Sequence, residues 1–231
     1  MNDKYSYYDF LANIIPGLLV LSVLIWLFNV LKINFEFKTA EILGVGIGLA
    51  VAYSLGHVIQ AISSFVQPIY YFLWGGIPSD NLLSGKSNML GEYRGQIVKQ
   101  LKDALDIGSS KEAGGDYKEV FSRAMAVVNS EKIGRVEAFN ASYAFHRALL
   151  TSTWMLSSLL TIILILAYLN ELSLNENGSA IAIVMILGWA SATIEFFRTR
   201  QRGYYFAKEV IYCAYYHLTK SGGKDVKSTS H

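Results

Sequence analysis

The chain has 231 residues, of which 52% are hydrophobic and only 16% are charged, with a formal net charge of +2. Soluble domains carry about 25% charged residues, so this composition excludes an ordinary cytosolic enzyme and favours a membrane protein. The balanced charge argues against direct nucleic acid binding. The single cysteine, Cys213, leaves no intramolecular disulfide and no thiolate metal cluster.

The first uncharged stretch, from Phe10 to Leu31, is long enough to cross a bilayer as a helix. A hydrocarbon core of ~30 Å takes about 20 helical residues. A cleavable signal peptide fits poorly, because Asp3 and Asp9 precede the stretch and the apolar run is too long. We therefore expect an uncleaved first span, in which Pro16 produces either a kink or a separate interfacial turn.

The second apolar run, from Ile42 to Gly76, is too long for one perpendicular span, since at ~1.5 Å per residue it would reach roughly 50 Å. Its first half is expected to cross the membrane. Its second half carries Pro68 and then an aromatic cluster from Tyr70 to Trp74. Aromatic side chains with a polar tip settle at the headgroup level, so we expect this half to emerge, bend at Pro68 and lie near the interface.

Two further runs, Ala148–Leu169 and Ala180 to about Phe197, complete four predicted spans. The chain is thus predicted to be an all-α multi-pass membrane protein with a small cytosolic helical insertion between spans two and three. Four domains are expected. Residues 1–76 form a first transmembrane pair and residues 77–145 a cytosolic helical hairpin. Residues 146–202 form a second transmembrane pair, and residues 203–231 an aromatic helix with a disordered tail.

The placement of Lys and Arg predicts the orientation. Apart from Lys32 and Lys38, every basic residue lies at the termini or in the middle segment. The positive-inside rule therefore places both termini and the insertion in the cytoplasm.

The cytosolic part is predicted to be helical. A stripe of apolar residues runs from Ser87 to Ile107, and an Asp116-x-x-Glu119 start resembles a capping box. A third helix is expected to open near Ser130 and to continue into the third span. The last stretch, Tyr204–Leu218, is too apolar for a lone cytosolic helix, so it should lie on the membrane surface or against another subunit.

The second span contains small residues at four-residue spacing, namely Gly44, Gly48, Ala52 and Gly56. This small-xxx-small pattern lets two helix backbones approach closely. The ladder can serve packing within one subunit or a subunit interface, and the pattern leaves both open.

Polar residues follow the ladder in the same span, namely His57, Gln60 and Ser64. Polar groups in hydrocarbon normally face protein or a water-filled cavity. One hypothesis is that these three residues line a pore or cavity in an oligomer, with His57 as a protonation-sensitive gate. The alternative is that they bond to a neighbouring span or sit near the headgroups.

Glu195 is the only acid within a predicted span, one helical turn before Arg198. We predict an interfacial ion pair between these two residues, with His146 or Arg147 as the alternative partners at the same depth. The cluster of Arg198, Arg200 and Arg202 is expected to contact anionic lipid headgroups.

Catalytic motifs are missing from the sequence. There is no P-loop, G-x-S-x-G, H-E-x-x-H or C-x-x-C, and the R-x-x-x-x-H pair of one class of defence ribonucleases is also absent. The sequence therefore predicts a non-enzymatic protein without a metal or cofactor. An intramembrane enzyme would need more acids, histidines or nucleophiles at one depth than this chain offers.

Four segments carry a resemblance to known proteins: YDFLANIIPGLLVL, YSLGHVIQAIS, FNASYAFHRALL and RTRQRGYYFAKEVIY. In their order the chain resembles uncharacterised bacterial four-span inner-membrane proteins of anti-phage loci, such as the membrane component of Kiwa and the membrane accessories of type VI-B CRISPR nucleases. The resemblance implies an oligomeric membrane sensor, scaffold or permeabilising effector with a cytosolic protein partner. The alternative is a channel or transporter subunit with a housekeeping substrate.

Overall fold

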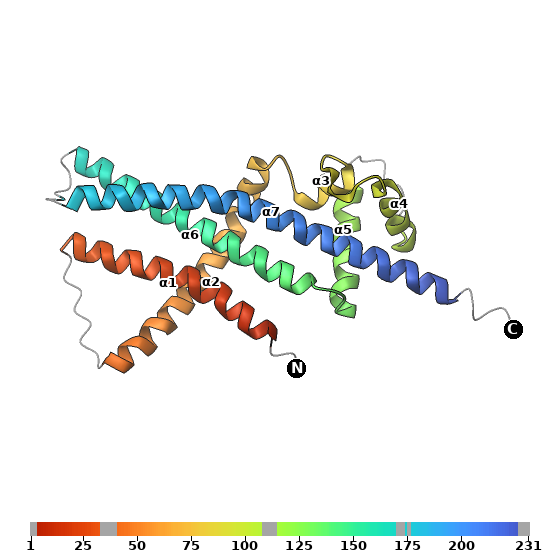
Figure 1. The fold of residues 1–231 in the computed structure, drawn as a ribbon, viewed down its shortest axis with the longest axis horizontal. Coiled ribbons are helices and arrows are strands. Elements are labelled where there is room, and N and C mark those ends of the chain that lie inside the picture. Colours follow the sequence, from red (N-terminus) through yellow and green to blue (C-terminus); the bar gives the residue numbers. More distant parts are fainter. Residues whose placement is uncertain (1–3, 33–40, 108–114, 170–173, 175–176, 226–231) are drawn as a thin grey trace. The chain divides into compact units, whose positions relative to one another are not determined.

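The computed structural model describes residues 4–32, 41–107, 115–169, 174 and 177–225, and these residues are almost entirely helical, with no β-strand among them (Figure 1). The predicted all-α fold is confirmed. The helices are α1 (Lys4–Val30), α2 (Glu41–Leu73), α3 (Pro78–Ser84), the short 3₁₀ helix η1 (Asn88–Leu90), α4 (Arg94–Ala104), α5 (Gly115–Glu131), α6 (Val136–Tyr168) and α7 (Gly178–Asp225).

Four of these helices, α1, α2, α6 and α7, are long and apolar enough to cross a membrane, as predicted from the charge gaps. The third predicted span does continue the residues before it without a break, because α6 begins at Val136 and ends at Tyr168, but the predicted start near Ser130 is wrong, since Ser130 lies in α5. The C-terminal helix extends beyond the predicted Leu218, since α7 continues to Asp225, and residues 226–231 lie outside the described range.

The two prolines expected to bend or interrupt the apolar runs both lie inside helices. Pro16 lies within α1 and Pro68 within α2, so no separate turn replaces the helix at Pro16, while the predicted kink at Pro16 and bend at Pro68 stay predictions. A proline removes one backbone hydrogen bond, and long apolar helices tolerate that loss. Instead α2 ends at Leu73, before Gly75 and Gly76, whose φ angles of 79° and 125° suit residues without a Cβ.

The chain divides into two compact units. Unit 1 consists of residues 1–67 and 141–199, and unit 2 of residues 68–140 and 200–231. The four predicted parts combine in pairs: the two transmembrane pairs belong to unit 1, and the insertion and the C-terminal helix belong to unit 2. The boundaries also lie several residues before the predicted ones.

Within unit 1, α1 crosses α2 at very close range (Figure 1). A Cβ placed on Gly17 would lie 1.7 Å from the backbone oxygen of Ala52, and one on Gly56 would lie 1.9 Å from that of Asn13. Only glycine fits at these two positions. The crossing therefore depends on the small residues of α2 that the sequence singles out, and on Gly17 of α1.

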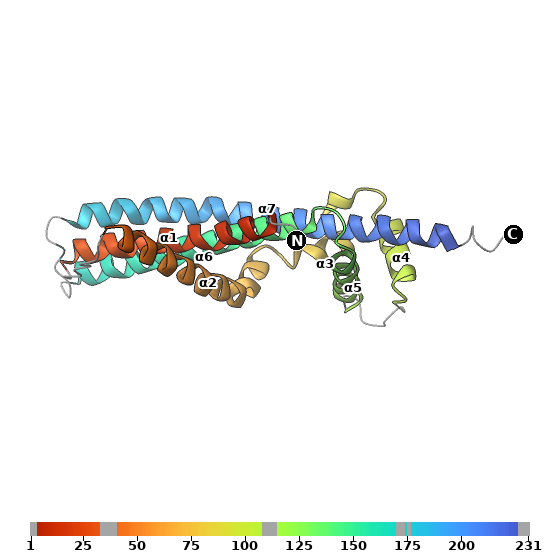
Figure 2. The same cartoon turned by 90° about the horizontal axis from the view of Figure 1, so that it is seen from below.

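Helices α1, α6 and α7 also pack together in unit 1, and Figure 2 shows α6 and α7 running side by side. Leu27, Leu160, Ile163 and Ile181 form a buried apolar cluster between them. Trp189 Nε1 donates a hydrogen bond to Thr161 Oγ1 over 3.2 Å. These contacts join the last turns of α1 to α6 and α7, and α6 to α7.

Unit 1 buries small polar residues and exposes large apolar ones. Ser63, Ser152 and Ser157 are fully buried, whereas Leu187 and Ile194 are 63% and 62% exposed. The same distribution continues with other exposed apolar side chains: Ile25, Val58, Phe65, Ile162, Ile165, Ile183, Ile186 and Phe197. This arrangement is the reverse of a water-soluble domain.

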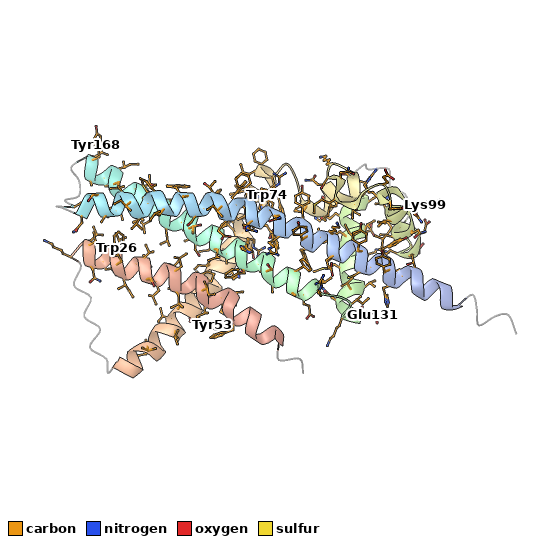
Figure 3. All side chains as sticks on the ribbon, in the orientation of Figure 1. Trp26, Tyr53, Trp74, Lys99, Glu131 and Tyr168 are labelled. Atoms are coloured by element: carbon orange, nitrogen blue, oxygen red, sulfur yellow. The ribbon has the colours of Figure 1, made fainter. Side chains whose placement is uncertain are left out.

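Unit 2 has the opposite arrangement, with a mainly apolar core that also buries Ser79, Asn81 and Asp116. Its core combines residues of α3, η1, α4, α5 and the last part of α7: Leu82, Leu83, Leu90, Ile97, Leu101, Val120, Ala124, Val128, Tyr204, Ala207, Val210, Ile211 and Ala214. The side chains of Lys99 and Glu131, labelled in Figure 3, are exposed on this unit. Its charged residues lie outside, as in a soluble domain.

The core of unit 2 corrects the prediction for the aromatic C-terminal helix. Val210 and Ile211 are completely buried against helices of the same chain, not against a membrane surface or a second subunit. The Tyr204 hydroxyl accepts a buried hydrogen bond from Asn81 Nδ2 over 2.9 Å. The apolar residues of this helix are therefore explained by the chain's own insertion.

Candidate functional site

A group of polar side chains, here called the polar layer, lies between the helices of unit 1. Its members come from α2, α6 and α7, and none belongs to unit 2. They are Gln60, Ser63, Ser64 and Gln67 of α2, Tyr143, His146 and Arg147 of α6, and Glu195 of α7. The sequence analysis singled out five of these eight, and it missed Ser63, Gln67 and Tyr143.

Arg147 is the centre of the polar layer. Its Nη1 donates to Gln67 Oε1 over 2.7 Å, its Nη2 to Ser64 Oγ over 3.0 Å, and its Nε to Ser63 Oγ over 3.2 Å. The guanidinium also lies 5.5 Å from the centre of the Tyr143 ring. Every one of these partners is neutral.

Gln67 links Arg147 to Tyr143 and thereby ties α2 to α6. Its Nε2 lies 3.1 Å from the Tyr143 hydroxyl, while its Oε1 accepts from Arg147. The sequence does contain a signal for this polar face. Ser63 and Ser64 are four and three residues before Gln67, which is the spacing of neighbours on one helix face.

Gln60 faces the inside of unit 1. Its Nε2 lies 3.4 Å from the backbone oxygens of Ala12 on α1 and Ala144 on α6. This geometry agrees with the alternative of a polar residue that bonds to neighbouring spans. Gln60 therefore joins three helices, and its amide is not free to line a cavity within the chain.

His57 lies apart from Gln60, although only one helical turn separates them. Its side chain is exposed on α2 and packs edge-on against Tyr53, with ring centres 4.6 Å apart. Tyr53, labelled in Figure 3, in turn stacks on Phe10 of α1 at 5.7 Å. The three predicted pore residues are thus not gathered at one place: His57 is exposed, Gln60 faces inward and Ser64 contacts Arg147.

Glu195 pairs with His146 and not with Arg198. Glu195 Oε2 lies 2.8 Å from His146 Nδ1, and the two side chains are 19% and 18% exposed. Within the described part of the chain, no ion pair joins Glu195 to Arg198. The predicted pair is therefore replaced by its alternative, because α6 places His146 beside the inward face of α7 while Arg198 points to the exposed side.

The glycine ladder of α2 is used only in part by the chain itself. Ala52 and Gly56 contact α1, whereas a Cβ on Gly46 or Gly48 would meet no atom within 4 Å. Gly44 at the start of the ladder is half-buried. Packing within the subunit is therefore found for the second half of the ladder, and the first half has no partner in unit 1 that approaches Gly48.

The three arginines at the end of the apolar part of α7 differ in their surroundings. Arg198 and Arg200 are exposed, and the Arg200 guanidinium lies 5.9 Å from the Tyr204 ring centre. Arg202 is half-buried, and its Nε atom is buried without a hydrogen bond within the described residues. Contact of all three with lipid headgroups stays a prediction.

No known protein shares enough with this chain to assign a family: no family model matches, and neither a curated protein nor a solved structure does. The chemistry of the site must therefore be argued from its residues. Within the described residues, no group of three His, Cys, Asp or Glu side chains is arranged to hold a metal ion. What the polar layer offers is a cation held by neutral side chains and one acid–histidine pair.

Proposed function

We propose that this chain is a non-enzymatic multi-pass membrane protein whose unit 1 lies in the bilayer and whose unit 2 lies in the cytoplasm, where it contacts a protein partner. The observation that carries the proposal is the opposite burial in the two units. Unit 1 exposes Leu187 and Ile194 and buries serines, and unit 2 buries Leu82 and Val210 and exposes its charges. Apolar side chains on this scale are stable outside only in lipid.

The spacing of the polar layer supports the same proposal. On α6, about 20 uncharged residues separate Arg147 from Tyr168, which is roughly 30 Å of helix and matches a hydrocarbon core. Trp26 of α1 and Tyr168 of α6 lie toward the same end of unit 1 (Figure 3). Aromatic residues at one end and the polar layer at the other are what two headgroup regions require.

A labelling experiment tests insertion and orientation together. In a Cys213→Ser background, Lys99→Cys and Tyr168→Cys place single thiols at exposed positions of unit 2 and unit 1. An impermeant maleimide added to spheroplasts should label Tyr168→Cys, but should label Lys99→Cys only after permeabilisation. Equal labelling of both, or release of the chain by an alkaline carbonate wash, would contradict the proposal.

Self-association through α2 is the second part of the proposal. Gly48 has open space around it, and its neighbours Val45 and Leu49 are 65% and 43% exposed. A second copy of the chain would give this half of the ladder the close helix contact that α1 gives the other half.

A matched pair of variants tests the assembly. Gly48→Leu should reduce the oligomer mass measured by light scattering in detergent, whereas Gly46→Leu, on another face of the same helix, should not. A monomeric wild type would contradict self-association, as would two variants that behave alike.

The biological setting rests on the resemblance to four-span proteins of anti-phage loci. We propose that the assembly senses membrane disturbance or permeabilises the membrane during infection. Plaque formation on cells with and without the gene, and with the Gly48→Leu variant, tests this role. Equal plating on all three strains would refute it.

A channel or transporter subunit is the second candidate, and one observation favours it. His57 is exposed in the middle of an apolar helix, where a polar ring is stable only if an assembly surrounds it with water or protein. This candidate predicts solute flux in liposomes without a trigger, and loss of that flux in His57→Ala.

A further inference from the structure

We propose that the last turns of α2 carry a membrane-contacting surface of unit 2, where lipid headgroups and the first carbons of the acyl chains cover Ile69, Phe72 and Leu73. These three residues are here called the end face of α2. They lie in unit 2, which begins at Pro68. The step rests on the proposed function, in which the earlier turns of α2 cross the bilayer.

The first reason is the exposure of the end face. Phe72 is 83% exposed, and Ile69 and Leu73 are each slightly more than half exposed. Among the described residues of unit 2, the other exposed large hydrophobic residues are one isoleucine and three tyrosines: Ile77, Tyr93, Tyr205 and Tyr216. Water can solvate the hydroxyl of a tyrosine, whereas the end face has no polar atom in its side chains. An apolar patch of this kind marks a contact with lipid or with another protein.

The second reason is that another side of the same turns is also apolar and is already covered. Tyr70 and Trp74, one helical turn apart, are almost completely buried and stack with their ring centres 6.1 Å apart. The chain therefore covers one side of this helix end and leaves Phe72 on an uncovered side. A helix that is apolar all round is stable only when every side is covered.

The third reason favours lipid over a protein as the cover. Val58 and Phe65 precede Phe72 at intervals of seven residues, which is the spacing of one helix face, and both are exposed. The end face thus continues the apolar face of the preceding membrane span. No Asp, Glu, Lys or Arg occurs from Ile42 to Ser79, so the face lacks the charged rim that is common around protein interfaces.

The fourth reason is the length of α2. Its 33 residues reach about 50 Å, which is about 20 Å more than the hydrocarbon core. An apolar helix longer than the core tilts, and Figure 1 shows α2 crossing α1 obliquely in unit 1. A helix that leaves the core at a slant keeps one side against the headgroups for further turns, and the end face fits that position.

Depth-dependent fluorescence quenching tests the contact in the full chain. In the Cys213→Ser background, a single cysteine replaces Phe72, Tyr93 or Leu187 and carries a nitrobenzoxadiazole dye. All three positions are exposed, so the dye does not disturb a packed core. The chain is reconstituted in vesicles of phosphatidylethanolamine and phosphatidylglycerol. Lipid-bound nitroxides near the headgroup or near the end of the acyl chain quench from the membrane, and iodide on both sides quenches from water.

We expect the shallow nitroxide to quench the dye at Phe72 at least about threefold more than the dye at Tyr93. Tyr93 is the matched control, because it is an exposed aromatic residue of the same unit outside the end face. Iodide should quench the dye at Tyr93 most. The dye at Leu187, in the middle of the apolar part of α7, should respond most to the deep nitroxide.

A charge placed on the end face gives a second measurement. Ile69→Asp should reduce the shallow quenching at Phe72 by at least about twofold, because a carboxylate is costly at the boundary of headgroups and acyl chains. Gln96→Asp adds the same charge at another exposed position of unit 2 and should leave the quenching unchanged.

Three results would overturn the proposal. They are equal quenching of the dyes at Phe72 and Tyr93 by either quencher, no effect of Ile69→Asp, and protection of the dye at Phe72 from both quenchers, which would assign the end face to a second copy or a protein partner. The dye at Leu187 tests the proposed function separately. Deep quenching at Leu187 with iodide quenching at Phe72 would refute the contact and keep the membrane insertion, whereas iodide quenching at Leu187 would refute both.

Discussion

The crossing of α1 and α2 gives the sharpest prediction about stability. In Gly56→Ala the new Cβ would lie 1.9 Å from the Asn13 backbone oxygen, which is about 1.5 Å less than the 3.4 Å at which ordinary contact begins. The obstructing atom is backbone, so the two helices must separate. Overpacking of this kind costs about 1–3 kcal/mol, and the better helix propensity of alanine offsets about 1 kcal/mol. We expect a net loss of up to about 2 kcal/mol.

Gly46→Ala is the matched control, because it adds the same methyl group to the same helix. No atom lies within 4 Å of the new Cβ, so this variant should be neutral or more stable by up to about 1 kcal/mol. Gly17→Ala should behave like Gly56→Ala, since its Cβ would lie 1.7 Å from the Ala52 oxygen. The double variant should lose less than the sum of the two, because either methyl group already separates the helices.

The assay is equilibrium unfolding in mixed micelles of dodecyl maltoside and dodecyl sulfate, followed by the far-ultraviolet circular dichroism of the full chain. The midpoints should rank Gly46→Ala at or above wild type and Gly56→Ala clearly below it. Equal midpoints for the two variants would refute the close crossing. A lower midpoint for Gly46→Ala alone would place the helix contact on the other half of α2.

Three further predictions concern single contacts. Tyr204→Phe should destabilise the chain by about 1–2 kcal/mol in thermal unfolding, because it removes the buried acceptor of Asn81 Nδ2, and an unchanged Tm would contradict this. Burial, followed by the charge of Glu209, raises the pKa of Cys213 in unit 2, so less thiolate is present at a given pH and alkylation should be slow near neutrality. Glu209→Gln should lower that pKa and speed alkylation by iodoacetamide at mildly alkaline pH, as followed by mass spectrometry, and an unchanged rate would contradict this. Glu195→Gln should lower the free energy of unfolding in mixed micelles by about 1 kcal/mol, because the carboxylate that contacts His146 is lost. An unaltered unfolding midpoint would show that the pair contributes nothing.

The four long helices were predictable because the signal is local. The length and composition of a stretch such as Phe10–Leu31, which has no ionisable side chain, are enough to predict a membrane-spanning helix without knowledge of any distant residue. The absence of a break between the third span and the residues before it was predictable for the same reason. Pro16 did not separate a turn from α1, because a long apolar helix tolerates the loss of one backbone hydrogen bond.

The C-terminal helix was misread because its partners are remote in sequence. Its aromatic and apolar residues do need a cover, and the sequence does not say which surface supplies it. In the structure Val210 and Ile211 pack with Leu82, Leu101 and Val120, more than 80 residues earlier in the chain. The apolar residues of the insertion and of the C-terminal helix were both visible in the sequence, but the sequence pattern does not specify which helix packs against which.

The same distinction explains what was found and missed in the polar layer. The predicted pair of Glu195 with Arg198 was the local choice, and the observed pair with His146 depends on how α6 and α7 pack. The glycine ladder identified a close helix contact but not its extent. Which glycines α1 reaches depends on the crossing angle, and that angle is set by Gly17 as much as by α2.

The boundaries between the two units lie close to the residues of the polar layer in the sequence. The unit boundaries fall after Gln67, after Asn140 and after Thr199, and each lies within a few residues of a member of the layer. On the unit 1 side of these boundaries Ser63 and Ser157 are buried while Ile183 and Ile194 are exposed, and on the unit 2 side Ile97 and Ile211 are buried. A helix that leaves a bilayer changes the side chains it buries where its solvent changes. If unit 1 lies in the bilayer, as proposed above, we expect the polar layer to lie near that change on α2, α6 and α7.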